Sequence, residues 1–239
     1  MIPNLPVRPV SKLLVSCDAD IRLFQPYCKC VVPSFRLNAL LPPLNAHPDL
    51  QLVHIWKKQF VCEPSLFLAY QRLLPECEIL PGKTTLGCNY PADTAYNIAR
   101  VGKFAILNCR TADPVVKTLL ARANLCLIDV RQGYAKCSVC VVDETSIITS
   151  DRGIGAAARR AGLDVLEILP GHIRLDGFDY GFIGGASLKL DKNTLAFYGA
   201  VERHPSFLEI KQFLMQRNIQ YVSLGRRMLE DIGSAAIIS

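Results

Sequence analysis

Cysteine and histidine are the residues of this sequence that could supply a nucleophile and a proton carrier. Cys137 stands between Lys136 and Ser138, and a neighbouring cation lowers the pKa of a thiol, which favours the reactive thiolate. His172, the next histidine along the chain, could exchange protons with such a thiol near neutral pH. The sequence leaves the alternative open that Cys137 is a packed core cysteine and that His172 is an ordinary loop residue.

Acidic side chains could hold a positively charged ligand. Four aspartates each end a linker just before an apolar segment: Asp49, Asp93, Asp179 and Asp231. If the fold brings them to one mouth, their carboxylates would suit a cationic or multi-amine ligand. An Asp before a strand also caps its own backbone, so both interpretations stay open. Gly181, Gly184 and Gly185 lie between the last two aspartates and predict a close approach of backbone or ligand.

The spacing of the ten cysteines does not favour a metal site. Zinc sites usually combine two short C-x-x-C pairs, whereas this sequence has one such pair, Cys137 and Cys140, and one C-x-C pair, Cys28 and Cys30. Residues three apart on an extended strand point to opposite faces. We therefore expect no metal, no cofactor and, without a secretory signal, no disulfide framework.

Composition indicates a globular chain. The 239 residues are 50% hydrophobic and 20% charged, which excludes disordered, collagen-like and coiled-coil classes. No uncharged apolar stretch approaches the roughly 20 residues that span a bilayer. The N-terminal segment has prolines at positions 3, 6 and 9 and lacks the pattern of a signal peptide. These features predict a cytoplasmic protein with no membrane partner.

The positive net charge is spread along the chain. Lys and Arg outnumber Asp and Glu by 27 to 21, giving a net charge of +6, but no basic run exceeds two residues. Nucleic-acid surfaces usually show clustered basic residues. The pattern favours a solvated basic surface over a nucleic-acid partner, and it says nothing about oligomeric state.

An internal repeat organises the chain, and such periods decide the fold class. Each unit reads strand, tight turn, strand, helix, strand, over residues 50–81, 94–130, 137–170 and 181–225. Acidic caps and prolines mark the expected helix starts, at Glu63-Pro64, Asp113-Pro114, Asp151 and His204-Pro205. The strand turns are short and polar, as hairpins require.

A fifth unit is divided between the two ends of the chain. Residues 1–34 supply strand, helix (18–25) and strand, and residues 234–239 supply the missing first strand. Pairing of the last strand with the first would close a ring without exposed edges. We therefore predict one domain over residues 1–239, an α/β fold built as a five-bladed propeller of ββαβ units. A shuffled Rossmann-like sheet is the alternative.

This arrangement resembles the pentein superfamily, the five-bladed α/β propeller of the guanidine-modifying enzymes. The superfamily includes arginine deiminase, agmatine deiminase and dimethylargininase, and also a ribosome anti-association factor without enzyme activity. Segments 132–153, 171–190 and 231–239 are more narrowly similar to an uncharacterised bacterial family of that fold. The resemblance implies a site around the ring axis, where enzymes of the superfamily use a Cys nucleophile, a His and carboxylates that hold the guanidinium group.

Residue by residue, this chain departs from the enzyme pattern. Ser234 or its neighbour stands where the enzymes have their cysteine, and Tyr134 stands where they have their histidine. Asn97, with Asp93 upstream, replaces one acid, and Asp49 takes the place of another. The resemblance therefore implies that the protein is not a standard deiminase or dimethylargininase.

Three functions stay open at this point. The first is binding of a small cationic, guanidino or amino-acid-like ligand in an axial pocket, for which the candidate residues are Asp49, Asp93, Asn97, Lys136, Cys137, Ser138, Asp179, Asp231 and Ser234. The second is a non-catalytic interaction with RNA, a ribosome or a protein. The third is a hydrolase or transferase in which Cys137 is a relocated nucleophile, with His172 as its partner.

Overall fold

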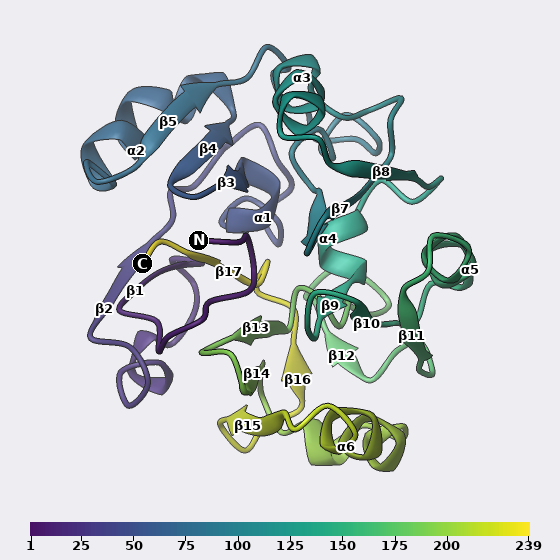
Figure 1. The fold of residues 1–239 in the computed structure, drawn as a ribbon. Helices are drawn as coiled ribbons and strands as arrows, with labels where there is room; N and C mark the ends of the chain where they lie inside the picture. The colour runs from purple at the N-terminus through teal and green to yellow at the C-terminus, as the bar shows by residue number, and fades with distance from the viewer.

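Five three-stranded sheets form the framework of the computed structural model, which describes residues 1–239 (Figure 1). In each sheet the middle strand pairs antiparallel with one neighbour and parallel with the other. The sheets are β17 (Ala235–Ile237) with β1 (Lys12–Val15) and β2 (Cys30–Pro33); β3 (Leu52–Trp56), β4 (Gln59–Cys62) and β5 (Glu78–Pro81); β6 (Ala99–Val101), β7 (Phe104–Leu107) and β8 (Cys126–Asp129); β9 (Cys140–Val141), β10 (Ser146–Thr149) and β11 (Asp164–Glu167); and β13 (Ser187–Lys189), β14 (Thr194–Tyr198) and β15 (Gln220–Leu224).

A helical segment connects the two parallel strands in every sheet, as a parallel crossover requires. These segments are the 3-10 helix η1 (Ile21–Leu23), η2 with α2 (Pro64–Leu66 and Phe67–Leu73), α3 (Pro114–Arg122), α5 (Arg152–Arg160), and η3 with α6 (Val201–Arg203 and Phe207–Met215). Figure 1 shows α2, α3, α5 and α6 on the outside, with the first strands of the sheets nearer the middle. The strand, strand, helix, strand order predicted for the four continuous units is confirmed.

Three of the four predicted helix starts carry side-chain caps, at Glu63, Asp113 and Asp151. The fourth, at His204-Pro205, is shifted, because α6 begins at Phe207 and its N-cap Ser206 makes no such bond. Asp113 accepts hydrogen bonds from the backbone N–H groups of Val115 and Val116, at 2.8 and 3.3 Å. Asp151 accepts one from Ile154, at 2.8 Å. Such caps satisfy amide groups that the first helical turn leaves without partners. The ends of the chain also meet as predicted, because β17 pairs with β1 from Leu13–Ile237 to Val15–Ala235.

Three predicted elements differ from the structure, and one sheet was not predicted. The helix predicted over residues 18–25 is only the short η1. The strand predicted from Cys137 begins at Cys140, because residues 135–138 form the helical turn α4 (Ala135–Ser138). The strand predicted over residues 181–190 is reduced to β13, because residues 181–186 wrap around the side chain of Asp231. A two-stranded sheet of β12 (Ile173–Arg174) and β16 (Leu229–Glu230) was not foreseen.

Buried apolar side chains from the sheets and the inner faces of the helices fill the space between them. Two short helical turns, α1 (Pro48–Gln51) and α4, stand just before first strands and carry fully buried residues. They place the polar groups described below near the middle of the molecule. None of the helices has the length and apolar character that crossing a membrane requires.

Candidate functional site

Asn97 joins the two helical turns at the centre of the molecule. Its Oδ1 accepts hydrogen bonds from the backbone N–H groups of Lys136, at 2.7 Å, and Cys137, at 3.1 Å. Its Nδ2 donates to the carbonyl oxygen of Asp49, at 3.0 Å, and to Sγ of Cys137, at 3.1 Å. One amide therefore holds α1 against α4. It also turns residues 135–138 into a helix rather than a strand.

The thiol of Cys137 is buried and donates to Oδ2 of Asp49 across 3.1 Å. Burial, followed by the negative charges of Asp49 and Asp231, raises the pKa of Cys137 well above its ordinary value. Loss of the proton would place a third negative charge beside two carboxylates. The group is therefore a hydrogen-bond donor at neutral pH, whereas a nucleophilic cysteine needs the opposite shift.

A cavity of about 100 Å³ lies on one side of Cys137. We call it the aromatic cavity, and its walls are Leu44, His47, Leu50, Tyr134, Cys137, Leu175, Phe178, Tyr180, Phe182 and Asp231. The ring of Phe182 lies 6.0 Å from that of Tyr134 and 6.4 Å from that of Tyr180, between centroids. Aromatic faces of this kind attract cations.

Asp231 is the carboxylate of the aromatic cavity. Its side chain is 1% exposed; Oδ2 accepts from the N–H of Phe182 at 2.9 Å, and Oδ1 accepts from the N–H of Gly233 at 3.0 Å. Nδ1 of His47 lies 3.8 Å from Oδ1 and has no hydrogen-bond partner. Burial is the main cause of the raised pKa of Asp231; the charge of Asp49 adds to it, and His47 opposes it. A bound cation would supply the missing opposite charge.

A second buried carboxylate fixes the position of one aromatic wall. The hydroxyl of Tyr134 donates a hydrogen bond to Oδ2 of Asp93, whose Oδ1 has no partner. Burial raises the pKa of Asp93, against the opposing effect of this hydrogen bond. Burial and the neighbouring carboxylate raise the pKa of Tyr134 in turn. The phenol therefore keeps its proton, and the ring of Tyr134 is held against the cavity.

Gly181, Gly184 and Gly185, which were predicted to allow a close approach, lie directly against Asp231 or the backbone of α4. A Cβ on Gly185 would stand 1.8 Å from Oδ1 of Asp231, and one on Gly184 would stand 2.3 Å from the carbonyl oxygen of Lys136. The N–H of Gly185 donates to the carbonyl of Cys137 at 2.9 Å. The backbone of residues 184–185 thus packs directly on α4 and on the buried carboxylate.

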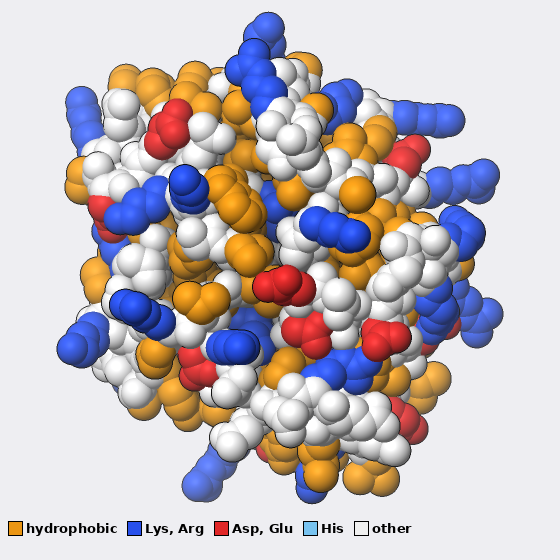
Figure 2. Space-filling model, in the orientation of Figure 1, with side chains coloured by type: hydrophobic (Ala, Val, Ile, Leu, Met, Phe, Trp, Pro, Cys, Tyr) orange, Lys and Arg blue, Asp and Glu red, His pale blue; other side chains and the backbone are white.

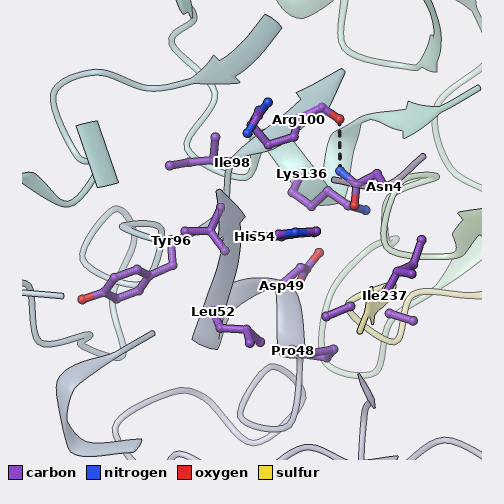
Figure 3. A pocket seen from close by; sticks show the side chains of 13 residues that line it. Asn4, Pro48, Asp49, Leu52, His54, Tyr96, Ile98, Arg100, Lys136 and Ile237 are labelled. Atoms are coloured by element: carbon purple, nitrogen blue, oxygen red, sulfur yellow. Dashed lines mark hydrogen bonds between the residues drawn. The ribbon is translucent and has the colours of Figure 1, made fainter. Parts of the chain in front are cut away.

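Lys136, next to Cys137 in α4, faces a different space. A second cavity, of about 30 Å³, is lined by Asp49, His54, Arg100, Lys136 and nine further residues (Figure 3). Figure 3 shows Lys136 and Asn4 on one side of it and Asp49 below, next to His54. Cys137 does not line this second cavity, and Lys136 does not line the aromatic cavity. The Asp49–Cys137 hydrogen bond stands between the two.

The predicted site residues therefore fall into groups. Asp49, Asn97, Cys137 and Asp231 are buried together, and Asp93 reaches the aromatic cavity through Tyr134. Ser138 is buried and its hydroxyl has no partner. Ser234 donates to the carbonyl of Ser187 at 2.7 Å and borders a small pocket beside Lys136. Asp179 is exposed and outside both sets of lining residues.

His172, predicted as the partner of Cys137, lies elsewhere. It is exposed and packs edge-on against the ring of His204, 5.9 Å away, whereas Cys137 is buried against Asp49 and Asn97. The histidine that shares the aromatic cavity with Cys137 is His47, which the sequence analysis did not select. The sequence could have pointed to His47 through its position two residues before Asp49, in His-Pro-Asp. It could likewise have pointed to Tyr180 and Phe182, the aromatic residues on either side of Gly181.

A comparison with protein families places the chain in one of them. The model of a family described as "Family of unknown function (DUF6873)" matches residues 21–236. The chain belongs to this family. No curated protein sequence matches it.

Solved structures show the wider relationship. An amidinotransferase of the saxitoxin biosynthetic pathway from Microseira wollei superposes with a TM-score of 0.58 at 9% identity, covering 93% of this chain and 90% of that one. Inosamine-phosphate amidinotransferase from Streptomyces griseus gives 0.58 at 11% identity, with coverages of 98% and 95%. Agmatine deiminase from C. jejuni gives 0.52 at 9%, with coverages of 90% and 75%. The chain therefore shares the α/β fold of these guanidine-modifying enzymes. At these identities the likeness shows the α/β fold and not the activity.

Proposed function

We propose that this protein binds a small organic cation, with a guanidinium or amine head group, in the aromatic cavity. The observation that carries the proposal is a fully buried carboxylate, Asp231, set among the rings of Tyr134, Phe178, Tyr180 and Phe182. Aromatic faces and a carboxylate are complementary to a planar cation that can donate hydrogen bonds.

The size of the cavity supports a head group rather than a large ligand. Its volume of about 100 Å³ is smaller than the roughly 150 Å³ that accommodates a benzene molecule in a protein core. A guanidinium or methylammonium group is smaller than benzene. A longer substituent would have to leave past Phe178 and Tyr180, which are 40% and 42% exposed.

The same proposal includes the finer architecture predicted from the repeat. Five sheets of one pairing pattern, together with pairing between β1 and β17, support a five-bladed propeller made from a single domain. The aromatic cavity would then lie near the axis of that ring.

Binding is tested with two ligands of matched shape. Methylguanidinium and its neutral analogue N-methylurea are titrated by calorimetry at pH 7.5 with one constant counter-ion. We expect methylguanidinium to bind and N-methylurea to bind at least about tenfold more weakly, because a desolvated charge pair contributes about 1.5–3 kcal/mol.

Two variants locate the bound cation. Asp231→Asn removes the charge and should weaken methylguanidinium binding at least about tenfold, whereas Asp179→Asn, at an exposed acid that does not line the aromatic cavity, should leave it unchanged. Phe182→Leu should weaken binding about threefold by removing one cation–π contact. Equal affinity for the charged and neutral ligands, or an unchanged affinity in Asp231→Asn, would show that the aromatic cavity is not a cation site.

A further inference from the structure

Two buried lysines without a carboxylate partner line the same small pocket. Lys136 is 8% exposed and Lys189 is 2% exposed, and both line one small pocket of about 10 Å³. Nζ of Lys136 donates to the carbonyl of Gly184 at 3.2 Å, and Nζ of Lys189 donates to the carbonyl of Lys192 at 2.8 Å. No carboxylate lies within 4.0 Å of either ammonium group. Each ammonium has three donors, so donors are left over inside the protein.

A third buried cation lies next to this pair. Arg100 is 1% exposed, and its guanidinium group donates to the carbonyl oxygens of Ile55, Gly102 and Phe104. It borders the 30 Å³ cavity of Figure 3, which shares Asn4 and Lys136 with the small pocket. We call these two adjoining spaces the basic chamber. Figure 2 shows basic groups recessed near the middle of this face as well as at its rim.

The chain supplies too little negative charge to balance these groups. Asp49 is the one carboxylate that lines the basic chamber, and its Oδ2 is taken by the thiol of Cys137. Its Oδ1 is buried and has no hydrogen-bond partner. Asp143 and Asp191 act on Lys189 from the partly exposed surface, where water screens them. Three buried cations against one buried carboxylate leave two positive charges uncompensated.

Neither titratable neighbour of the chamber serves as a counter-ion. Cys140 is buried close enough to feel the charges of Lys136 and Lys189, but burial raises its pKa to about 11, so it remains a neutral thiol. His54 donates through Nε2 to the carbonyl of Lys57 at 2.7 Å, and burial with the nearby Arg100 lowers its pKa to about 3. Burial also lowers the pKa of Lys189 to about 8, and that lysine is still largely charged at pH 7.

We propose that the basic chamber is an anion site, which holds an anion of the size of chloride or formate between the ammonium groups of Lys136 and Lys189. Buried charges are costly unless they are paired, and an anion in the pocket that both lysines line would accept hydrogen bonds from their unused donors. The hydroxyl of Ser187 lines the same pocket, next to the thiol of Cys140, and makes a long contact, 3.5 Å, with the carbonyl of Gly184. It can turn to donate to the anion.

The dimensions of the chamber select small anions. A water molecule needs about 10–15 Å³ of this kind of space, so the cavities of about 30 and 10 Å³ hold about two water molecules and about one, which leaves room for a single anion no larger than formate. Phosphate and gluconate are too large. The site lies on the other side of the Asp49–Cys137 contact from the aromatic cavity, so this proposal does not depend on the binding of a cation there.

The test compares anions in thermal unfolding at constant ionic strength. Sodium chloride and sodium formate, each at 100 mM, are compared with sodium gluconate and with sodium phosphate of equal ionic strength. At about tenfold excess over Kd we expect chloride and formate to raise Tm by about 2 to 5 °C relative to gluconate. Phosphate stabilises folded proteins by exclusion from their surface, so any rise of Tm in phosphate should be the same in the native protein and in the lysine variants described below.

Variants separate a bound anion from a general salt effect. Lys136→Met and Lys189→Met should each abolish the chloride-dependent shift, and Lys211→Met, at an exposed lysine on α6, should retain it. Ser187→Ala is the milder change and should weaken chloride binding about threefold while leaving the fold intact. Crystals soaked in bromide should show an anomalous peak between Nζ of Lys136 and Nζ of Lys189.

Two results would overturn the proposal. One is the same Tm for the native protein in chloride, formate and gluconate, together with no bromide peak in the chamber. The other is a chloride shift of full size in Ser187→Ala and in both lysine variants, since the anion would then be bound elsewhere.

Discussion

The aromatic cavity and the basic chamber are neighbours with opposite chemistry. One has a buried carboxylate among aromatic rings, and the other has buried ammonium and guanidinium groups beside small polar side chains. A single layer of hydrogen bonds from Asn97, Cys137 and Asp49 separates them. The difference shows how one short turn serves two environments, because the consecutive residues Lys136 and Cys137 of α4 face opposite sides.

The strongest test of this separation removes the amide that builds it. Asn97→Ala deletes four hydrogen bonds and leaves buried partners on α1 and α4 unsatisfied. We expect the free energy of unfolding to fall by about 3 kcal/mol, measured by urea denaturation. Asn89→Ala, at an exposed residue whose side chain makes no hydrogen bond, is the control. A loss below about 1 kcal/mol would mean that Asn97 does not hold the layer together.

A smaller effect is expected where the backbone packs on Asp231. Gly185→Ala places a methyl group on the carboxylate of Asp231, so we expect a loss of about 2 kcal/mol in unfolding free energy. Binding of methylguanidinium should weaken as well. Gly153→Ala, on an exposed position of α5, brings a methyl group only to 3.1 Å from Oδ1 of Asp151, so it should cost less than about 1 kcal/mol. Equal stabilities of the two variants would contradict the close packing seen at Gly185.

The pH dependence of cation binding sharpens the contrast between the cavities. The pKa of Asp231 is raised in the free protein, and the protonated acid carries no charge to attract a cation. The affinity for methylguanidinium should therefore rise with pH through that raised pKa, by up to about tenfold per unit. The groups that face Asp231, namely His47, Asp49 and Cys137, set where the rise occurs. Calorimetry from pH 4.5 to 8 measures it, and Asp231→Asn should give a flatter profile.

The smallest signal concerns the thiol in the dividing layer. Burial and two carboxylates raise the pKa of Cys137, so iodoacetamide at pH 7 should modify it at least about tenfold more slowly than the exposed Cys30, Cys88 and Cys126. Peptide mass spectrometry over a time course gives each rate. Labelling of Cys137 ahead of the exposed cysteines would instead support the hypothesis that Cys137 is a nucleophile.

Sequence patterns predicted the framework well because helix caps and strand turns are local signals. The starts at Asp113 and Asp151 depend on such signals, and the return of residues 235–237 to β1 was predicted from the repeat, because the N-terminal unit lacked its first strand. The site was harder to predict. Cys137 is drawn into a helical turn by the side chain of Asn97, 40 residues away, and no local pattern carries that contact. For the same reason the sequence did not reveal that His47 lines the cavity. Nor did it reveal that Asp179 is exposed although its neighbours Phe178 and Tyr180 line the cavity.

The length of the segment between Tyr134 and Ser138 has a consequence for how this family can vary. Successive residues of a helix differ by about 100° in direction, so an insertion or deletion of one residue here would turn the thiol and the ammonium group away from their own cavities. Exposed linker residues that line neither cavity carry no such constraint. We therefore expect related chains to differ in length at those exposed residues and to keep these five positions ungapped.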